Sequence, residues 1–490
     1  MDFKTRTTKT KSGNTAVQIV NYVKRKTIIL KHIGSASNET ELKILKDEAR
    51  NWILNEINEK SLFKISFNEA DTFRKTYEYL GAHLVFAYEF LSKIYLKFNF
   101  QKHTDELVRY LVLTQILEPG SKRSSVLFLK EKLGVKLHLT NVYEWMIKSD
   151  PVLKEKIQKE SIQIAKQDFH FDFSFVLYNV TTLYFESFKN DEFKKAGFSK
   201  DNKHHQPQIV IGLIVTREGF PVYYEVFKGN TFEGNTFLPI LLDFKNKNAV
   251  KNITVVADSA MFSKLNFEKL KENGINYIVG ARLLNQKKEI LEQIENSKLK
   301  KKQRESIRLD DLIVEYSEER YKKDKREMGK QIEKARLYEN TESTKFRKLK
   351  FLKNDKARYY LDQNLIEKNT KLLGMKGYVT NLDLPNTEII DYYHNLFKVE
   401  HAFRIAKSDL EARPIYHHKE ESIKNHILLC FMSLAISIYL ELKTKRSIKE
   451  IARELKNVTD AQMKSKITGK MIAIRSELST RLQEIVNLSY

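Results

Sequence analysis

The feature that most constrains this 490-residue chain is a succession of strand and helix patterns between residues 171 and 281. FSFVLYNVTTLYFES is rich in β-branched and aromatic residues and predicts a strand, and QIVIGLIVTREGFPVYYEVFKG predicts a hairpin that turns at Arg217-Glu218-Gly219. A helix pattern (NTFLPILLDFKN), the strand ITVVAD, a second helix pattern (FSKLNFEKLKENG) and the strand INYIVGA follow. Three strands in a row and then alternating helices and strands predict an α/β fold, with a mixed sheet covered by helices.

The region before this core is basic at its start and helical afterwards. Two β-branched runs within residues 14–33 predict a hairpin, and a helix pattern through ELKILKDEARNWILNEI follows. The basic tail and hairpin fit a DNA-contacting arm and a solvated basic hairpin equally well. Residues 70–168 have helical periodicity, with Pro119-Gly120 between two helices and Ser121 near an N-cap. That pattern fits both a helix–turn–helix DNA-binding unit and a plain helical bundle.

The region after the first core segment is interrupted by charge. Residues 282–371 are rich in Lys and Glu and predict an inserted subdomain with strands near LDDLIVEYSEERY and ARYYLDQNLI. The insert fits a solvated charged segment as well as a phosphate-contacting one. A short strand (KGYVTN) and one helix from about Asn386 to Ala412 are expected next, and residues 415–490 carry helical patterns throughout.

At roughly 100–200 residues per domain, the length predicts about three or four structural units. The patterns divide the chain more finely: a basic β-hairpin plus helix arm (1–60), a helical DNA-binding region (61–168), the first part of the α/β core (169–281), an inserted basic β-rich subdomain (282–371), the second part of the core with the helix of Glu400 (372–412) and a C-terminal helical region (413–490).

The charge balance favours a polyanionic partner. The chain has 86 Lys and Arg against 63 Asp and Glu, a formal charge of +23, which suits nucleic acid or an anionic membrane surface. The N-terminal residues MDFKTRTTKTKSGNT contain no apolar signal region, and the apolar stretch Ile427–Leu440 is shorter than the roughly 20 residues of a spanning helix, so a buried helix is expected there. A single cysteine, Cys430, excludes a disulfide framework and fits a reducing compartment. We therefore expect a nucleic-acid partner, no membrane association and a cytoplasmic, nucleoid-associated location.

Several chemistries lack their sequence motifs. The chain has no GxxxxGK[ST] or strand-linked GxGxxG for nucleotide binding and no HExxH or CxxC for zinc. The pairs His204-His205 and His417-His418 are expected at the surface.

Acidic residues at a strand end and on one helix remain as candidates. Asp258 follows the predicted strand 253–257, where a sheet presents ligand-binding groups, although it could equally cap the next helix. On the helix after Pro385, Tyr393, Glu400 and Lys407 are seven residues apart and would align within roughly 40°.

The same helix carries an apolar stripe beside that polar one. The stripe predicts that Glu400 stands at the edge of the seam between sheet and helix, shielded from solvent. The alternative is a surface ion pair between Glu400 and Arg404, one turn apart. The residues of the apolar stripe are Leu396, Val399, Phe403, Ala406 and Leu410.

Four segments together resemble insertion-sequence DDE transposases: LYNVTTLYFES, GFSKDNKHHQPQIVIGLIVTREGFPVYYEVFKGNTFEGNTFLPIL, VVADSAMFS and YYHNLFKVEHAFRIAKSDLEARPIYH. The resemblance covers about residues 80–440 and is closest to the branch with a β-rich insertion between the second Asp and the Glu. It implies an RNase H-like core, two Mg²⁺ ions for which Mn²⁺ can substitute, cleavage of double-stranded DNA at transposon ends and strand transfer to target DNA. It also implies a homodimer that synapses two ends.

The resemblance assigns roles to individual positions. Asp258 matches the second acidic residue of the family and Glu400 the third, while Tyr393 and Lys407 match the motif around that Glu. Lys407 and Arg404 are expected to bind flanking phosphates, and Tyr393 to stack on a base or hold a phosphate. The Arg that often lies between the Tyr and the Glu is replaced here by Leu396, which removes one phosphate contact.

The larger departure is at the first acidic position, which is Asn179 in this chain. An amide keeps one neutral oxygen donor but lacks the negative charge that two Mg²⁺ ions require. Asp172 is seven residues upstream, so along one strand it faces the other way and lies roughly 23 Å off. We therefore expect a chain that folds and binds DNA but cleaves it poorly. Two alternatives stay open: a non-catalytic DNA-binding remnant of a transposase, and an RNase H-like nuclease that does not transpose.

Overall fold

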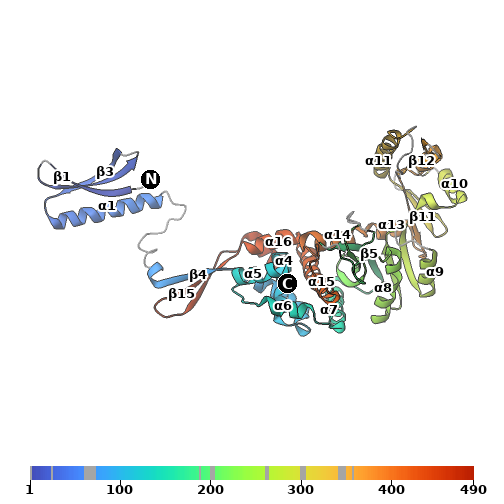
Figure 1. Cartoon of the computed structure of the whole chain (residues 1–490), viewed down its shortest axis with the longest axis horizontal. Coiled ribbons are helices and arrows are strands. Elements are labelled where there is room, and N and C mark those ends of the chain that lie inside the picture. Colours follow the sequence, from blue (N-terminus) through green and yellow to red (C-terminus); the bar gives the residue numbers. More distant parts are fainter. Residues whose placement is uncertain are drawn as a thin grey trace. The chain divides into compact units, whose positions relative to one another are not determined.

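The computed structural model describes residues 3–10, 12–23, 26–59, 73–186, 189–198, 205–259, 264–297, 299, 305–339, 349–355 and 358–489. The chain forms two compact units (Figure 1). The smaller unit comprises residues up to 82 together with 460–475, and the larger unit comprises 83–459 and the residues from 476 onward.

The N-terminal part of the smaller unit is a three-stranded antiparallel sheet with one helix packed on it. Its elements are β1 (Phe3–Lys9), β2 (Thr15–Val23), β3 (Lys26–Ala36) and α1 (Glu39–Glu59). The predicted hairpin and helix are confirmed, while Lys24 and Arg25 of its turn lie outside the described residues. The stretch expected as a basic tail is instead strand β1, anchored where the Phe3 ring meets Trp52 edge-on with centroids 6.2 Å apart. The sequence did not predict this strand, because charged residues interrupt the apolar pattern that marks a strand.

A second small sheet corrects the expectation that residues 415–490 are wholly helical. Strands β4 (Tyr77–His83), β15 (Asp460–Ser465) and β16 (Met471–Arg475) pair in the order β16-β15-β4. The partner strand β4 is almost 400 residues away in sequence from β15, so local patterns could not predict the pairing. The helical patterns hold for the other C-terminal elements, which are α15 (Glu420–Thr444), α16 (Ile448–Lys456) and α17 (Thr480–Leu488).

The larger unit is built on an eight-stranded mixed sheet of order β10-β11-β14-β9-β8-β5-β6-β7. Strands β5, β8 and β9 run parallel to one another, whereas β6 is antiparallel to both β5 and β7. The five strands in chain order therefore lie as 3-2-1-4-5, which is the RNase H-like arrangement, and the α/β prediction is confirmed. Their bounds are β5 (Phe175–Tyr184), β6 (Gln208–Val215), β7 (Pro221–Lys228), β8 (Ile253–Ala257) and β9 (Ile275–Ala281).

These central strands are covered on both faces, which explains their nearly continuous apolar sequences. All of β6 is buried, as are the eight inner residues of β5. Helix α8 (Glu233–Lys247) lies on one face, where the Tyr178 hydroxyl bonds to Thr236 at 2.7 Å. Helix α9 (Lys264–Glu272) connects β8 to β9.

The inserted segment contributes to the same sheet. Strand β14 (Met375–Thr380), which follows the inserted segment, pairs with β9. Two strands of the inserted segment extend the sheet beyond β14: β11 (Leu312–Tyr316) pairs with β14, and β10 (Ser306–Leu309) pairs with β11. The strand expected near LDDLIVEYSEERY is thus confirmed for its first half, since a helix begins at Glu318. The segment also contains α10 (Lys288–Asn296), α11 (Glu318–Arg336), α12 (Gln363–Lys371) and the short hairpin β12 (Leu352–Asp355) and β13 (Arg358–Leu361).

Helices before the core form a bundle with the C-terminal ones. The predicted break at Pro119-Gly120 is confirmed, and Ser121 caps α5 by accepting a hydrogen bond from the Ser124 N–H at 3.1 Å. Because α4 packs on α15 and α16, the pair around this break is part of the bundle. The helices are α3 (Val85–Lys97), α4 (Glu106–Leu117), α5 (Lys122–Leu133), α6 (Leu139–Met146) and α7 (Pro151–Phe169).

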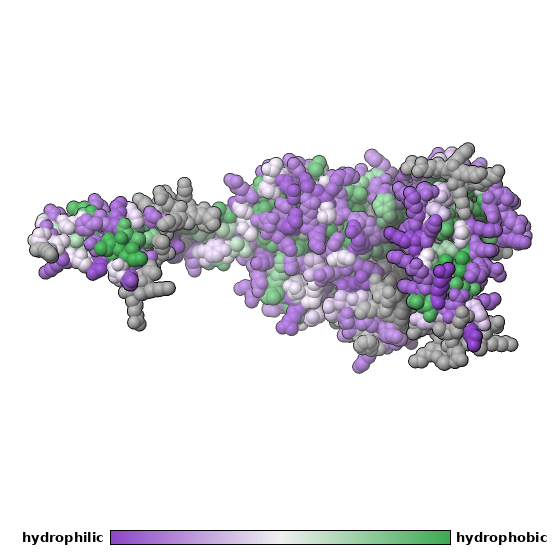
Figure 2. Space-filling model, turned by 90° about the horizontal axis from the view of Figure 1, so that it is seen from above, coloured by the Kyte–Doolittle hydropathy of each residue, from purple (hydrophilic) through white to green (hydrophobic). Residues whose placement is uncertain are grey.

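Helix α15 is the buried helix that the apolar stretch predicted. Within the described residues it is long and apolar enough to cross a membrane, but 83% of its apolar window is buried inside the protein. Cys430 is a buried free thiol in it. The surface drawn in Figure 2 is by contrast mostly hydrophilic, as the 30% of charged residues requires.

The helix expected from Asn386 to Ala412 is broken into three parts. Helix α13 (Asn386–His394) is followed by Asn395, whose side chain donates to the Asp391 carbonyl at 2.8 Å. Helix α14 (Phe397–Arg404) then continues into a π-helical turn, η5 (Ile405–Asp409). The break rotates the residues after it relative to those before it. The apolar stripe survives because Leu396, Val399, Phe403 and Leu410 are buried and Ala406 is partly so.

Candidate catalytic and DNA-binding site

Asn179 and Asp258 lie level with each other on neighbouring strands. Leu177 of β5 pairs with Val256 of β8 in parallel register, so two residues further along Asn179 stands beside Asp258, on the same face of the sheet. Thr181 and Leu183 share that face and line a cavity of about 40 Å³ with Phe403. The face that carries Asn179 is therefore the one covered by α14 and η5.

Asn179 is buried, with 9% of its surface exposed. Its side-chain oxygen accepts a hydrogen bond from the Val180 N–H at 2.7 Å. Asp172, by contrast, precedes β5, and its carboxylate accepts hydrogen bonds from the N–H (3.0 Å) and hydroxyl (2.6 Å) of Ser174. Asp172 is thus held in a local turn before β5 begins, whereas Asn179 lies in the middle of the strand.

Asp258 is partly buried at the end of β8. Its Oδ1 accepts hydrogen bonds from the Ser259 N–H at 2.6 Å and from the Tyr393 hydroxyl at 3.5 Å. Tyr393 reaches it across β9 at Gly280, where an added Cβ would lie 2.6 Å from the Tyr393 oxygen. Ile278 of β9 pairs with Val256 of β8, so Gly280, two residues further along β9, is also level with Asp258.

The Tyr393 hydroxyl is affected by the charges of both Asp258 and Glu400. Burial raises the pKa of the Tyr393 hydroxyl well above its usual value, and the negative charges of Asp258 and Glu400 raise it further. The two carboxylates therefore act on one hydroxyl from different elements, β8 and α14. The sequence placed Asp258 at a strand end and Glu400 at the edge of the seam between sheet and helix.

Glu400 is exposed, contrary to the expectation of a shielded position. Helix α14 is short and separate from α13, and its buried residues Val399, Ala402 and Phe403 turn Glu400 outward. The alternative of an ion pair with Arg404 does not hold either. Arg404 donates to His401 Nδ1 at 2.7 Å, and His401 Nε2 lies 2.9 Å from Glu441 of α15.

The expected stripe of Tyr393, Glu400 and Lys407 is not one helix face. Tyr393 is buried on α13, Glu400 is exposed on α14, and Lys407 is partly buried in the π-helical turn. Lys407 lines the same small cavity as Thr181 and Phe403. The seven-residue spacing failed because it assumed an unbroken α-helix.

Lys376 is the site residue that sequence reasoning missed. Its Nζ lies 4.4 Å from the Tyr393 ring centroid and 5.4 Å from that of Tyr378. Burial and then the charge of Arg320 lower the pKa of Lys376, while the opposing charges include Asp258 and Glu400. The segment KGYVTN carries no motif, so only the pairing of β14 with β9 could have revealed it.

Glu315 of β11 stands directly opposite Lys376 and extends the polar cluster. It accepts a hydrogen bond from the Tyr378 hydroxyl and lies 3.4 Å from His394 Nε2. Burial works to raise the pKa of Glu315, but His394, Tyr378 and Lys376 outweigh it and hold that pKa below its usual value.

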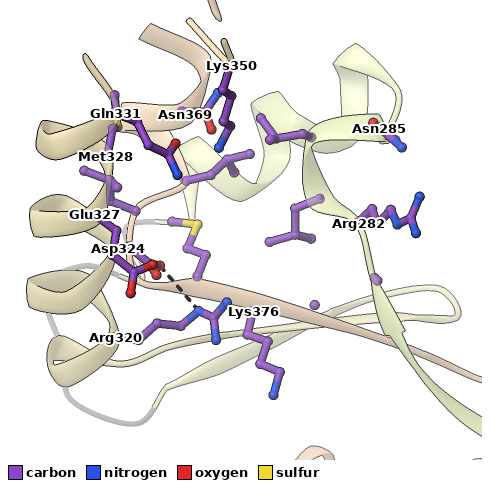
Figure 3. Close-up of a pocket in the computed structure, with 17 residues that line it drawn as sticks. Arg282, Asn285, Arg320, Asp324, Glu327, Met328, Gln331, Lys350, Asn369 and Lys376 are labelled. Atoms are coloured by element: carbon purple, nitrogen blue, oxygen red, sulfur yellow. Dashed lines mark ion pairs between the residues drawn. The ribbon is translucent and has the colours of Figure 1, made fainter. Parts of the chain in front are cut away.

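A cavity of about 400 Å³ begins at Lys376 and runs into the inserted segment (Figure 3). Its cationic side chains are Arg282, Arg320, Lys350 and Lys376. Figure 3 shows Arg320 beside Lys376 at one end, where Arg320 pairs with Asp324 at 3.4 Å. Asp324 and Glu327 also line the cavity, so two carboxylates offset part of the positive charge of its four cations.

The donors around Asp258 fit a divalent cation incompletely. Carboxylate and amide oxygens are hard ligands of the kind that Mg²⁺ prefers. Only Asp258 and Glu400 contribute charge, and across the described ranges there is no group of three or more His, Cys, Asp or Glu side chains that could hold a metal. Asn179, level with Asp258, adds an amide oxygen and no charge.

The histidine pairs behave differently from each other. His205 and His418 are exposed as predicted, and His204 lies outside the described residues. His417 is partly buried, with its ring centroid 5.3 Å from that of His426, which corrects the expectation of a surface pair.

Residues 171–436, more than half of the chain, match the family described as Transposase DDE domain. No curated protein sequence matches the chain. Among solved structures, a cryo-EM structure of a piggyBac transposase synaptic complex with hairpin DNA aligns with 10% identity and a TM-score of 0.38, covering 79% of this chain and 70% of that one. A Mos1 transposase paired-end complex with the left transposon end aligns with 11% identity and a TM-score of 0.16, covering 36% and 58%. The family match spans Asn179, Asp258 and Glu400.

Proposed function

The chain belongs to the DDE transposase family, and from that premise we propose that it binds the terminal inverted repeats of an insertion sequence and catalyses DNA cleavage and strand transfer. The observation that carries the proposal is that Asp258, within the matched family domain, accepts a hydrogen bond from Tyr393 and stands level with Asn179. A DNA strand would contact these residues where the central strand β8 ends.

Asp258, Glu400 and the Asn179 oxygen would hold divalent metal, Mg²⁺ or Mn²⁺, which when bound neutralises charge on the scissile phosphate and activates water. The protein's own residues prepare that position. Tyr393 donates to Asp258 and fixes one carboxylate oxygen. Lys376 supplies a cation between the acidic centre and the cavity of the insert, where it can neutralise a DNA phosphate.

DNA contacts are proposed at three further places. Arg404 is exposed beside Glu400 and is assigned a flanking phosphate, as is Lys407, while Tyr393, whose ring is buried, is assigned a phosphate contact and not base stacking. The cationic cavity at Arg282, Arg320 and Lys350 would hold DNA backbone, since these charges line a hollow. Recognition of the ends is assigned to the arm (1–60) and to the helical region (61–168). The formal charge of +23 supports all of these contacts.

Asn179 would make cleavage weak in this chain. Its amide supplies no charge, and its oxygen is already bonded to the Val180 N–H. Changes among groups that merely support metal ligands cost about 10–100-fold, so loss of a ligand's charge should cost at least that much.

The test is a plasmid cleavage assay with Mg²⁺ or Mn²⁺ that compares the chain with Asn179→Asp. We expect Asn179→Asp to cleave at least about 10-fold faster. In that background Asp258→Asn should abolish cleavage, whereas Asp172→Asn, which removes an equal charge in the turn before β5, should not. Equal and strong cleavage by the chain and Asn179→Asp would defeat the assignment of position 179.

The departure at Asn179 also favours a second candidate, a remnant that binds ends without catalysis. Footprinting on the ends distinguishes it: salt-sensitive, specific binding combined with failed cleavage after Asn179→Asp supports the remnant. If cleaved ends form but never join a target, the chain is instead an RNase H-like nuclease.

Synapsis of two ends would require two copies of the chain. We propose a homodimer on paired ends, acting on nucleoid DNA in the cytoplasm. Light scattering of the protein with and without end DNA tests this: the mass should correspond to two chains with two DNA ends, and a single chain on one end contradicts it.

A further inference from the structure

A second polar cavity, of about 200 Å³, shares no lining residue with the acidic centre. It is lined by the start of α5, by residues that follow η5 and by α15. Ligand cavities for drug-sized molecules measure about 300–1,000 Å³, so this one suits a single small group. The side chains that matter in it are Ser121, Lys122, Arg413, His417 and His426.

Lys122 is a buried cation without a counter-charge. Only 4% of its surface is exposed, and its Nζ donates to the Gln115 side-chain oxygen at 3.1 Å. Among the described residues no carboxylate forms an ion pair with it. A buried ammonium is unfavourable unless a negative group compensates it. Burial accordingly lowers the pKa of Lys122, which an anion would reverse.

His426 is a second buried group with an unmet hydrogen-bonding atom. It is 6% exposed, and its Nε2 lies 3.1 Å from the Ala412 carbonyl, so this nitrogen carries the proton. Its Nδ1 is buried with no hydrogen-bond partner. Burial and then the charge of Lys122 lower the pKa of His426, and an anion beside Lys122 would offset the second of these two causes.

The start of α5 adds to the positive potential. Gly120, Ser121 and Lys122 line the cavity where this 12-residue helix begins. Backbone N–H groups and the helix dipole favour anions at such a terminus. Arg413 brings a further positive charge, and Glu411, the one carboxylate among the lining residues, is exposed.

The cluster also fixes the chain that leaves the helix of Glu400. Gln115 is fully buried, and its Nε2 donates to the Leu410 carbonyl at 2.5 Å, while His426 binds the Ala412 carbonyl. Glu411 between them has a left-handed backbone with φ of 45°. Whatever binds Lys122 therefore contacts groups that hold this exit in place.

We propose that the cavity binds one phosphate group, and that on DNA this group is a backbone phosphate that ties the duplex to the exit of the Glu400 helix. The DNA role rests on the proposed function, whereas phosphate binding as such does not. A metal cation is disfavoured here by Lys122 and Arg413.

The first arm of the test uses inorganic phosphate and no DNA. Phosphate, compared with chloride at equal ionic strength, should raise the Tm of the full chain by roughly 2 °C. Lys122→Met and Arg413→Gln should each abolish the rise. Arg123→Gln, which removes the exposed neighbouring cation on α5, should keep it.

Phosphorus NMR tests binding in the unmodified protein, so its result does not depend on whether a variant folds. Binding should broaden the signal of free phosphate. No broadening and no Tm rise in the unmodified chain would overturn the site, as would a rise that survives both cavity variants.

The second arm measures end-DNA binding against salt. Loss of one phosphate contact should lower the slope of log K against log salt by about 0.9 in Lys122→Met. If phosphate binds in the first arm but this slope is unchanged, the cavity takes free phosphate and the DNA role is overturned. If no DNA binds at all, the proposed function fails while the first arm still decides the site.

Discussion

The hydroxyl of Tyr393 donates a hydrogen bond to Asp258 across strand β9, so a helix residue fixes a carboxylate at the tip of a different strand. Tyr393 is held by packing, since it is 6% exposed and its ring lies 4.8 Å from that of Tyr378. The contact makes the orientation of Asp258 depend on α13, and hence on the break that separates α13 from α14.

Removal of that hydroxyl should reduce cleavage without unfolding the protein. In the Asn179→Asp background, we expect Tyr393→Phe to slow plasmid cleavage by about 10-fold, the scale of losing a group that orients a ligand. Tyr392→Phe is the matched control, because the Tyr392 ring packs on Phe175 and is not bonded to Asp258. Equal rates for Tyr393→Phe and the control would show that the hydrogen bond has no role in cleavage.

Gly280 should tolerate no side chain. A Cβ there would lie 2.6 Å from the Tyr393 oxygen and 3.3 Å from the Ser259 nitrogen. We expect Gly280→Ala to lower the free energy of unfolding by about 1–3 kcal/mol, the scale of an overpacked core, and to displace Tyr393 from Asp258.

Urea denaturation measures the first effect and plasmid cleavage in the Asn179→Asp background the second. Gly329→Ala is the control, since nothing lies within 4 Å of its added Cβ and helix α11 should gain about 1 kcal/mol in propensity. A Gly280→Ala protein as stable as the unmodified chain would contradict the close approach of Tyr393.

Lys376 should compete with metal at the acidic centre. Its ammonium lies in the field of Asp258 and Glu400, so its charge repels a cation that approaches the same carboxylates. In the Asn179→Asp background, Lys376→Gln should lower the Mg²⁺ concentration for half-maximal cleavage by about threefold or more. Lys371→Gln removes an exposed cation paired with Glu295 and should leave that concentration unchanged. A higher Mg²⁺ requirement in Lys376→Gln would mean that the lysine assists the metal.

The core of the fold was predictable because its signals are local. Strands β5 to β9 follow from β-branched runs and a Gly219 turn with φ of 97°, and Asp258 follows from its place at a strand end. The buried stripe on the helix of Glu400 was likewise readable from spacing.

The rest depends on contacts that sequence spacing does not encode. Lys376 and Gly280 join the site only through the register of β14, β9 and β8, and β15 becomes a strand only beside β4. The turn from α13 to α14 hid the true exposure of Glu400. His417 was expected at the surface together with His418, whereas in the fold its ring lies beside that of the buried His426.

That burial gives His417 a measurable effect on stability. Burial, then the charges of Lys122 and His418, lower the pKa of His417 to about 4, against about 6.5 for an unperturbed histidine. Between these values the unfolded chain binds a proton that the folded chain does not, so this residue's contribution to stability is present above pH of about 6.5 and is lost as the pH falls toward 4. The groups that face it are Lys122, His418 and His426, and the charge of Lys122 disfavours a second cation among them.

We expect the Tm of the unmodified chain to fall from pH 7 to pH 5 more steeply than that of His417→Asn, measured by thermal unfolding in buffers of equal ionic strength. His205→Asn, which changes an exposed histidine, should keep the full pH dependence. Lys122→Met should also flatten the curve, because it removes the charge that opposes protonation of both His417 and His426. If His417→Asn and His205→Asn have the same pH dependence as the unmodified chain, His417 is accessible to protons in the folded protein and the packing of its ring against His426 is not maintained in solution.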